Sequence, residues 1–230
     1  AMGKKFQGVV DHYLFVGNPG TGKTTVARIM GNIFYSLGVL PSNRLLEVTR
    51  KDLVEGYVGQ TATKTARVVK RAVGGVFFID EAYSLMGDNF GQEATNTILP
   101  MLLDYKGKMV CIAAGYPREI RQWIDTNSGL ESRFTKVIHF EDYNPDELAQ
   151  IFRMKAKKDK LTLTPEAENA MRVYFTDLYN RRERNFANAR EVNNYFDRVK
   201  KNQSSRLRHE MERPDFDPAS YSILLPEDMG

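Results

Sequence analysis

The chain has 230 residues, of which 42% are hydrophobic, 27% charged and 11% aromatic, a composition that supports a folded core and excludes disordered and collagen-like classes. At roughly 100–200 residues per domain, we expect one large domain, or a large one with a small one. No stretch approaches the about 18 consecutive apolar residues of a membrane span, so we expect no membrane association. The single Cys111 cannot form an internal disulfide, so we expect a reducing, cytoplasmic compartment.

The charge is unevenly distributed along the chain. The net charge is +4, but residues 153–213 carry 16 basic and 9 acidic side chains, and residues 214–230 carry four acidic and no basic ones. A basic segment of this kind is suited to contact nucleic acid or an acidic partner. The alternative is a helical subdomain with solvated lysine and arginine faces, and we prefer that interpretation.

The first two thirds of the chain alternate strand patterns with helix patterns. We expect strands at 12–16, 45–49, 76–79, 109–114 and 136–140, and helices at 25–37, 63–72 and 92–104. Strands that alternate with helices predict an α/β fold, in which helices cover both faces of a parallel sheet.

After residue 143 the pattern becomes helical. Asn144-Pro145-Asp146-Glu147 and Thr164-Pro165-Glu166 are helix starts, each with a capping side chain followed by proline and acids. A third helix is expected to begin near Asn188 and run past Arg208, and no strand pattern appears before the tail. We therefore expect an α/β domain over residues 4–143, a small all-helical domain over 144–213 and a C-terminal tail over 214–230.

A glycine-rich loop joins the first expected strand to the first expected helix. Residues 17–24, Gly-Asn-Pro-Gly-Thr-Gly-Lys-Thr, match G-x-x-x-x-G-K-[ST], and this context distinguishes a phosphate-binding loop from an ordinary turn. The loop's N–H groups would surround a β-phosphate at a helix N-terminus. Lys23 would reach the β- and γ-phosphates, and the Thr24 hydroxyl would ligate Mg²⁺. We expect ATP and Mg²⁺, with nucleotide contacts from Asn18, Pro19, Gly20, Thr21, Gly22, Lys23, Thr24 and Thr25.

A second acidic motif follows the expected strand at 76–79. Asp80 comes directly after four apolar residues, at the carboxyl end of a strand, where open α/β sheets bind ligands. Asp80 would hold Mg²⁺ through water, and Glu81 would polarise a water for attack on the γ-phosphate. Because water needs a base, the Asp-Glu pair favours a Mg²⁺-dependent ATP hydrolase over a phosphotransferase.

Together these segments resemble a known family, the AAA+ ATPases, and specifically the group that contains stage V sporulation protein K and the red-type Rubisco activases. The ATPase of type VII secretion systems carries a similar module. The resemblance spans about residues 12 to 200 and implies a P-loop NTPase sheet followed by a helical lid. The matching segments are GNPGTGKTTVARIMG at 17–31, EGYVGQTATKT at 55–65, VFFIDEAYSL at 76–85, FGQEATNTILPMLLD at 90–104, AAGYPREI at 113–120, NSGLESRF at 127–134 and NFANAREVNNYFDR at 185–198.

The resemblance implies roles for two arginines. Arg133 lies where the family places its arginine finger, which would reach the nucleotide of the neighbouring subunit. There it would act in catalysis together with that subunit's Lys23 and Glu81. An arginine supplied in trans is worth about 10³–10⁵ in rate in phosphoryl transfer. Arg190 lies at the sensor-2 position of the lid and would couple the γ-phosphate to lid movement. The alternatives are an ordinary surface arginine at position 133 and an ordinary helix arginine at 190.

The resemblance also implies a pore loop. Tyr57 and Val58 lie between glycines after the second strand, where the family's loop faces the central pore of a ring and its aromatic side chain grips a polypeptide. The alternative is a tyrosine that covers nearby surface. Tyr116, after the fourth strand, replaces the polar sensor-1 residue of many AAA+ proteins. Its hydroxyl is suited to hold a water or phosphate, and whether it does so stays open.

The leading hypothesis is an ATP-hydrolysing module that assembles as a homo-oligomeric ring, in particular a hexamer, and remodels a protein client. The alternative is a nucleic-acid-directed AAA+ ATPase that uses the basic 153–213 region, which lacks a recognisable nucleic-acid motif. A third reading is a nucleotide-gated scaffold without turnover. Ala1-Met2-Gly3 resemble a cloning remnant. About ten residues precede the first strand, too few for the family's adenine-covering segment, so we expect a longer parent protein.

Three further residues receive no chemical role. Cys111 lies within a buried apolar strand and is expected to be inert packing. Trp123 is expected in the core. His12 shows no metal-ligand spacing to the other histidines and is expected to be an ordinary surface or strand residue.

Overall fold

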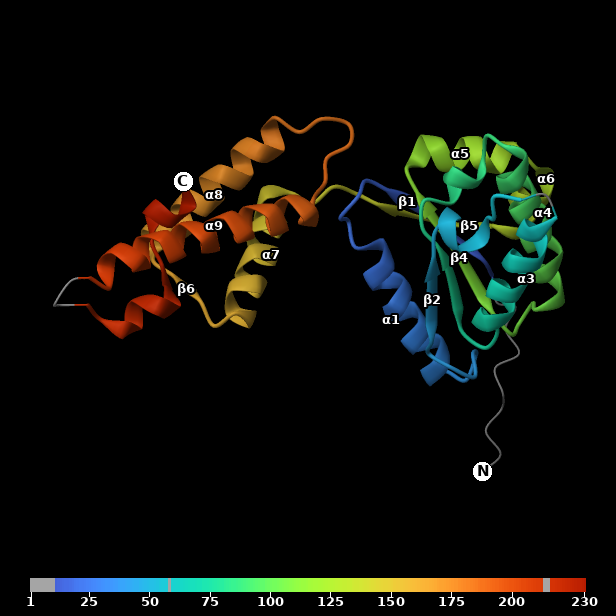
Figure 1. The fold of residues 1–230 in the computed structure, drawn as a ribbon, viewed down its shortest axis with the longest axis horizontal. Helices are drawn as coiled ribbons and strands as arrows, with labels where there is room; N and C mark the ends of the chain where they lie inside the picture. The colour runs from blue at the N-terminus through green and yellow to red at the C-terminus, as the bar shows by residue number, and fades with distance from the viewer. Residues whose placement is uncertain (1–10, 58, 213–215) are drawn as a thin grey trace, which may run out of the picture. The chain divides into compact units, whose positions relative to one another are not determined.

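The computed structural model describes residues 11–57, 59–212 and 216–230 (Figure 1). The chain divides into two units. The sheet unit contains the residues up to Gly17 and residues 22–140, and the lid unit contains residues 18–21 and 141–230. The phosphate loop is therefore shared between the two, with its glycine-rich tip assigned to the lid unit.

The sheet unit is built on five parallel strands in the order β2-β3-β4-β1-β5. All five coincide with the expected strands to within one residue at each end, which confirms the predicted parallel sheet. Central β3 and β4 are buried at every position, as their continuous apolar sequences predict. The strands are β1 Tyr13–Gly17, β2 Leu45–Val48, β3 Val76–Ile79, β4 Val110–Gly115 and β5 Lys136–Phe140.

Helices cover both faces of this sheet, as predicted (Figure 1). Because side chains alternate along a strand, Phe78 points into the cluster beneath α1, whereas Phe77 points into the larger cluster beneath the other helices. That larger cluster contains Trp123, which is 2% exposed, so its expected core position is confirmed. The helices are α1 Lys23–Ser36, α2 Arg50–Leu53, α3 Gln60–Ala72, α4 Asn89–Asp104, α5 Pro117–Asp125 and α6 Ser128–Arg133, with a 3₁₀ turn at Ala82–Leu85.

Two of these helices begin one turn earlier than the sequence predicted. Helix α4 starts at Asn89 because the Asp88 side chain accepts a hydrogen bond of 2.8 Å from the N–H of Gly91. Helix α3 starts after Gly59, which adopts φ +79°. A helix around Trp123 was expected and is confirmed as α5. The short helices α2 and α6 were not predicted, because neither is long enough to show a helical repeat of apolar residues.

The lid unit packs three helices around its own core: α7 Pro145–Lys158, α8 Pro165–Asn180 and α9 Ala189–Glu210. Both predicted helix starts are confirmed. The Asn144 side chain accepts from the N–H of Glu147 at 3.0 Å, and the Thr164 hydroxyl accepts from the N–H of Ala167 at 3.2 Å.

The expectation of a purely helical lid was wrong in one respect. Strand β6, Thr162–Leu163, pairs in parallel with strand β7, Ile223–Leu224, and 3₁₀ turns flank β7 at Pro218–Ser222 and Pro226–Met229. A two-residue strand is too short to show an alternating pattern in the sequence. In the tail, Leu224 and Met229 are buried in the lid core.

An ion pair fixes this tail to α9. The guanidinium of Arg206 donates two hydrogen bonds of 3.0 Å to the carboxylate of Asp228, whose side chain is 1% exposed. The Asp228 carboxylate raises the pKa of Arg206. The tail therefore belongs to the structure of the lid unit.

Candidate active site

The N-terminus of α1 is arranged to receive an anion. Its cap is Gly22, with φ +90°, and neither a capping side chain nor an acidic residue in the first turn occupies the helix end. The unpaired N–H groups of a first helical turn attract phosphate. Within the sheet unit, the ammonium of Lys23 donates a hydrogen bond of 2.8 Å to the carbonyl of Gly17, where β1 ends.

Two glycines of the loop are required by close backbone contacts. A Cβ at Gly17 would lie 2.3 Å from the carbonyl oxygen of Phe140 on neighbouring β5. Gly20 adopts φ +72°, and a Cβ there would lie 2.2 Å from the carbonyl oxygen of Ala187. These positions therefore exclude side chains for packing reasons as well as for phosphate access.

The tip of the loop is hydrogen-bonded within the lid unit. The Asn18 amide donates to Asp142 at 2.9 Å, and the Tyr143 hydroxyl donates to the carbonyl of Thr21 at 3.0 Å. The N–H of Ala189, the first residue of α9, donates to the carbonyl of Gly20 at 3.2 Å. The loop tip therefore contacts both the segment before α7 and the start of α9.

Asn188 connects these contacts. Its side chain is fully buried, and its amide nitrogen donates to Asp142 at 2.8 Å and to the carbonyl of Pro19 at 3.3 Å. Its amide oxygen accepts from the N–H of Tyr143 at 2.8 Å. Asn188 adopts φ 51° and ψ −122°, a conformation that is strained for a residue with a side chain. Buried, strained and fully bonded, Asn188 fixes the geometry of the loop tip.

Arg190 lies two residues after Asn188, in the first turn of α9. Its side chain is exposed and, among the described residues, its guanidinium makes no hydrogen bond or ion pair. An exposed arginine without an ion-pair partner among the described residues is suited to bind a phosphate. Sequence reasoning identified Arg190 but missed Asn188 and Asp142. Asn188 is the first residue of the Asn188-Ala189-Arg190 motif that identified Arg190, so this motif could have indicated Asn188 as well.

At the end of β3, Asp80 and Glu81 adopt a special backbone geometry. The N–H of Asp80 donates to the carbonyl of Val48 at 2.8 Å, and the Asp80 carboxylate accepts from the N–H of Glu81 at 3.1 Å. Glu81 has φ 51° and ψ 46° and an exposed side chain. A left-handed conformation costs a residue with a Cβ about 1–2 kcal/mol, and such strain clusters at functional sites.

Two tyrosines lie beside this pair. The rings of Tyr83 and Tyr116 have centroids 5.8 Å apart. Burial, followed by the charge of Glu81, raises the pKa of Tyr83 to about 12, so its hydroxyl stays protonated even in alkaline solution. A Cβ at Gly115 would lie 2.7 Å from the Tyr83 ring. Sequence reasoning considered Tyr116 but missed Tyr83, which stands two residues after Glu81.

The sheet order fits the expected oxygen ligands of Mg²⁺. Strands β1 and β3 flank β4 in parallel, so the Thr24 hydroxyl, just after β1, and the Asp80 carboxylate follow strands that end at the same edge. Hydroxyl and carboxylate oxygens suit Mg²⁺, which commonly keeps phosphate and water ligands as well. Among the described residues, no cluster of three or more histidine, cysteine, aspartate or glutamate side chains forms a ready-made metal cage. Thr24 and Asp80 are the residues that would hold Mg²⁺.

Arg133 closes α6 and lies partly buried against its own helix. Its guanidinium donates to the Ser132 hydroxyl at 2.6 Å and to the carbonyl of Gly129 at 3.4 Å. Its Nε is buried with no hydrogen-bond partner in the described part of the chain. The side chain lines a cavity of about 180 Å³ together with His12 and Lys106.

Tyr57 lies after α2 with 73% of its surface exposed. The neighbouring glycines, Gly56 and Gly59, have open space where a Cβ would be. The Tyr57 side chain is therefore available to a partner. Val58, the other expected pore-loop residue, lies outside the described residues.

Comparison with known proteins identifies the family. The family model described as "ATPase family associated with various cellular activities (AAA)" matches residues 13–142, and the AAA lid domain matches residues 144–230. The chain belongs to the AAA family of ATPases. It is an ATPase with an AAA lid, which confirms the family and the enzyme class expected from the motifs.

Relatives and solved structures agree with this assignment. Protein CbbX of Cereibacter sphaeroides is 41% identical over 222 residues, which cover 95% of this chain and 71% of the relative. The chloroplastic ribulose bisphosphate carboxylase/oxygenase activase of Cyanidioschyzon merolae is 43% identical over 201 residues, 85% of this chain and 68% of the relative. ESX-1 secretion system protein EccA1 of Mycobacterium tuberculosis is 45% identical over 173 residues, 73% of this chain and 30% of the relative.

The crystal structure of the FIGL-1 AAA domain matches with a TM-score of 0.65 at 17% identity, over 96% of this chain and 69% of that one. At this identity the match shows the fold alone. None of the described helices is both long and apolar enough to cross a membrane.

Proposed function

We propose that this ATPase works as a homo-oligomeric ring, in particular a hexamer, that couples Mg²⁺-dependent ATP hydrolysis to remodelling of a protein client. The observation that carries the hydrolytic part of the proposal is the left-handed Glu81, held at the end of β3 by its hydrogen bond to Asp80. This geometry presents the Glu81 carboxylate at the carboxyl ends of the parallel strands, where the phosphate loop also begins. Glu81 accepts a proton from the attacking water, while Lys23 and the N-terminus of α1 bind the phosphates.

Two residues, Arg133 and Tyr57, support action between subunits and on a protein. Arg133 is the last residue of α6, its side chain is only partly buried, and its Nε has no hydrogen-bond partner among the described residues, so its guanidinium has capacity to bind a further acceptor. Tyr57 is an exposed aromatic between unobstructed glycines, which suits a grip on an extended polypeptide. The relatives CbbX and Rubisco activase support a protein client, whose identity these residues do not specify.

The nucleic-acid alternative is the weaker one. The basic 153–213 region lacks a recognisable nucleic-acid motif, and several of its basic side chains are already paired with acids. Ion pairs join Arg153 to Glu168, Arg172 to Asp146, Arg181 to Asp177, Lys200 to Asp159 and Arg206 to Asp228.

The concentration dependence of turnover tests the ring. If the active site is completed by a neighbour, ATP hydrolysis per subunit rises with protein concentration and then levels off. Tyr57→Ala should keep this ATPase profile but lose client-stimulated turnover. Turnover per subunit that is constant over a hundredfold concentration range, in a chain shown to be monomeric, would contradict the proposal.

A further inference from the structure

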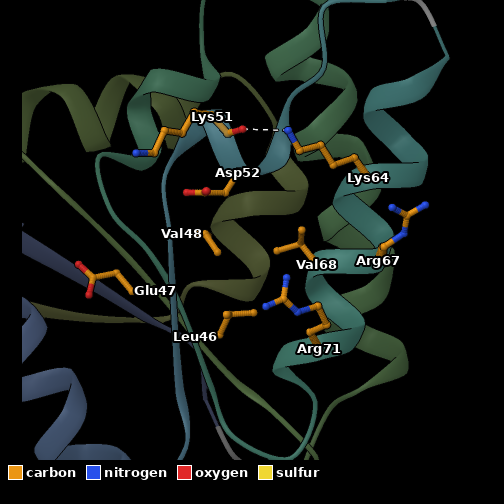
Figure 2. A pocket seen from close by; sticks show the side chains of 9 residues that line it. All are labelled: Leu46, Glu47, Val48, Lys51, Asp52, Lys64, Arg67, Val68 and Arg71. Atoms are coloured by element: carbon orange, nitrogen blue, oxygen red, sulfur yellow. Dashed lines mark hydrogen bonds between the residues drawn. The ribbon is translucent and has the colours of Figure 1, made fainter.

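A pocket of about 390 Å³ opens beside β2, and its lining includes none of the residues assigned to nucleotide chemistry. Figure 2 shows that Leu46 and Val48 on β2 face Val68 on α3, so the floor is apolar. Arg71 extends from α3 toward the strand across this floor. All of the lining residues come from β2, α2 and α3: Leu46, Glu47, Val48, Lys51, Asp52, Lys64, Arg67, Val68 and Arg71.

Two of the charged lining residues are already paired. The Asp52 carboxylate accepts from the N–H of Thr49 at 2.8 Å, and this hydrogen bond lowers the pKa of Asp52. The Lys64 ammonium lies 3.1 Å from Glu55. These groups shape the wall and leave little unsatisfied charge.

The two arginines differ from them. Arg67 and Arg71 are one turn apart on α3 and exposed, and their guanidinium groups make no hydrogen bond or ion pair within the described residues. A guanidinium binds carboxylates through paired N–H groups. Two arginines without ion-pair partners in the described part of the chain, above an apolar floor, therefore favour acidic side chains whose methylene groups cover the floor while their carboxylates reach the guanidinium groups.

The adjoining strand offers hydrogen bonds in addition to charge. β2 is a terminal strand of the five-stranded sheet. The N–H of Val76 donates to Arg44, and the N–H of Asp80 donates to Val48, so the even-numbered residues of β2 face β3. Because hydrogen-bonding groups alternate along a parallel strand, Leu45 and Glu47 direct their backbone N–H and C=O groups to the open edge.

We propose that β2 and the pocket beside it form a docking groove for an extended, acidic segment of a partner protein, which adds as a strand to the edge of the sheet. Backbone hydrogen bonds to Leu45 and Glu47 provide affinity, and carboxylates on the face toward α3 pair with Arg67 and Arg71. The groove goes beyond the proposed function, because docking requires neither ATP hydrolysis nor a ring.

Fluorescence anisotropy of the full chain without nucleotide tests this directly. The probe is a labelled Thr-Glu-Val-Glu-Val-Glu-Thr peptide, in which every glutamate lies on one face of a strand. Arg71→Glu should weaken binding at least tenfold. The matched control Lys70→Glu makes the same charge change at the preceding residue of α3, which does not line the pocket. It should change peptide binding less than twofold. Both substitutions are at exposed positions, and equal melting temperatures would verify folding.

Two further probes separate strand addition from general charge attraction. One peptide is N-methylated at every glutamate and a second at every valine. Because N–H groups alternate between the two sides of a strand, only one of these peptides has its blocked N–H groups directed at β2, and only that peptide should lose binding. A labelled oligouridylate should not compete. The proposal is overturned if Arg71→Glu and Lys70→Glu weaken peptide binding equally. It is also overturned if both methylated peptides lose binding or if neither does. Binding of the oligouridylate alone, with dependence on Arg71, would overturn it as well.

Discussion

The amide nitrogen of Asn188 donates a hydrogen bond of 2.8 Å to the carboxylate of Asp142. The same carboxylate accepts from Asn18 of the phosphate loop at 2.9 Å. Asp142 thus joins the loop tip to the residue that precedes α9, the helix that carries Arg190. The lid residues around the loop therefore help to hold its tip in position.

Asn188→Asp should weaken ATP binding at least tenfold. The substitution replaces the donor by a second carboxylate facing Asp142, and buried like charges repel. The matched control is Asn193→Asp on the same helix, where an exposed asparagine accepts from Lys155 at 2.7 Å and an aspartate keeps that contact. Isothermal titration with ATP, together with melting temperatures, separates loop positioning from simple destabilisation. Equal ATP affinity in the two variants would refute the positioning role.

Glu81→Gly and Glu81→Ala should both reduce hydrolysis by about 10²–10⁴-fold, because each removes the general base. They should differ in stability. Glycine adopts φ 51° without strain, whereas alanine retains the strain, so the glycine variant should be more stable by about 1 kcal/mol. Steady-state turnover and urea denaturation check the two effects. A glycine variant less stable than the alanine variant would show that the strain at Glu81 is not significant.

The stability of the sheet unit should fall at mildly acidic pH because of His12. The side chain is 5% exposed and its Nδ1 accepts from the N–H of Cys111 at 3.0 Å. Burial lowers the pKa of His12 below its ordinary value, so the folded chain favours the neutral ring. The stabilising contribution is complete above about pH 6.5 and is lost, by up to about 1.4 kcal/mol per pH unit, as the pH falls toward the lower folded pKa.

Melting temperatures of His12→Asn between pH 8 and pH 5 check this, since the asparagine oxygen can still accept from Cys111. The variant should lose less stability than the parent chain on acidification. His139→Asn, at an exposed position of β5, should keep the parent profile. Parallel profiles for all three proteins would exclude His12 as the source.

Asp228→Ala should destabilise the lid by about 2–3 kcal/mol, because it removes two hydrogen bonds from a largely buried guanidinium that keeps only Glu210, at 3.0 Å, as a close acidic partner among the described residues. The neighbouring Glu227 is 64% exposed and lies 3.6 Å from the same guanidinium, and Glu227→Ala should cost less than about 1 kcal/mol. Urea denaturation of the two variants provides the comparison. If both cost the same, the tail is not held by the buried pair.

The sequence predicted the parts of this fold that depend on local pattern. The apolar runs of β3 and β4 and the helix starts at Asn144 and Thr164 were all found. The pairing of β6 with β7 was missed, because it joins segments some sixty residues apart through two residues each.

The residues of the candidate site likewise fall into those that a local sequence pattern predicts and those that it does not. The phosphate loop and the Asp80-Glu81 pair are contiguous motifs, so their residues could be named from the sequence. Asn188, Asp142 and Tyr83 acquire their importance from contacts between distant segments or from burial, which no local pattern records. His12 was expected at an ordinary surface or strand position, and its buried hydrogen bond to Cys111 could be seen only in the fold.

A subunit-mixing experiment tests the central claim, that hydrolysis at one subunit requires Arg133 of another. Lys23→Ala should abolish ATP binding but leave Arg133 intact, and Arg133→Ala should leave the phosphate site intact but remove the finger. Each variant alone should be inactive. An equimolar mixture should regain substantial turnover, because a Lys23→Ala subunit supplies its arginine to the intact site of an Arg133→Ala neighbour. A mixture no more active than its components, or full turnover by Arg133→Ala alone, would contradict the account.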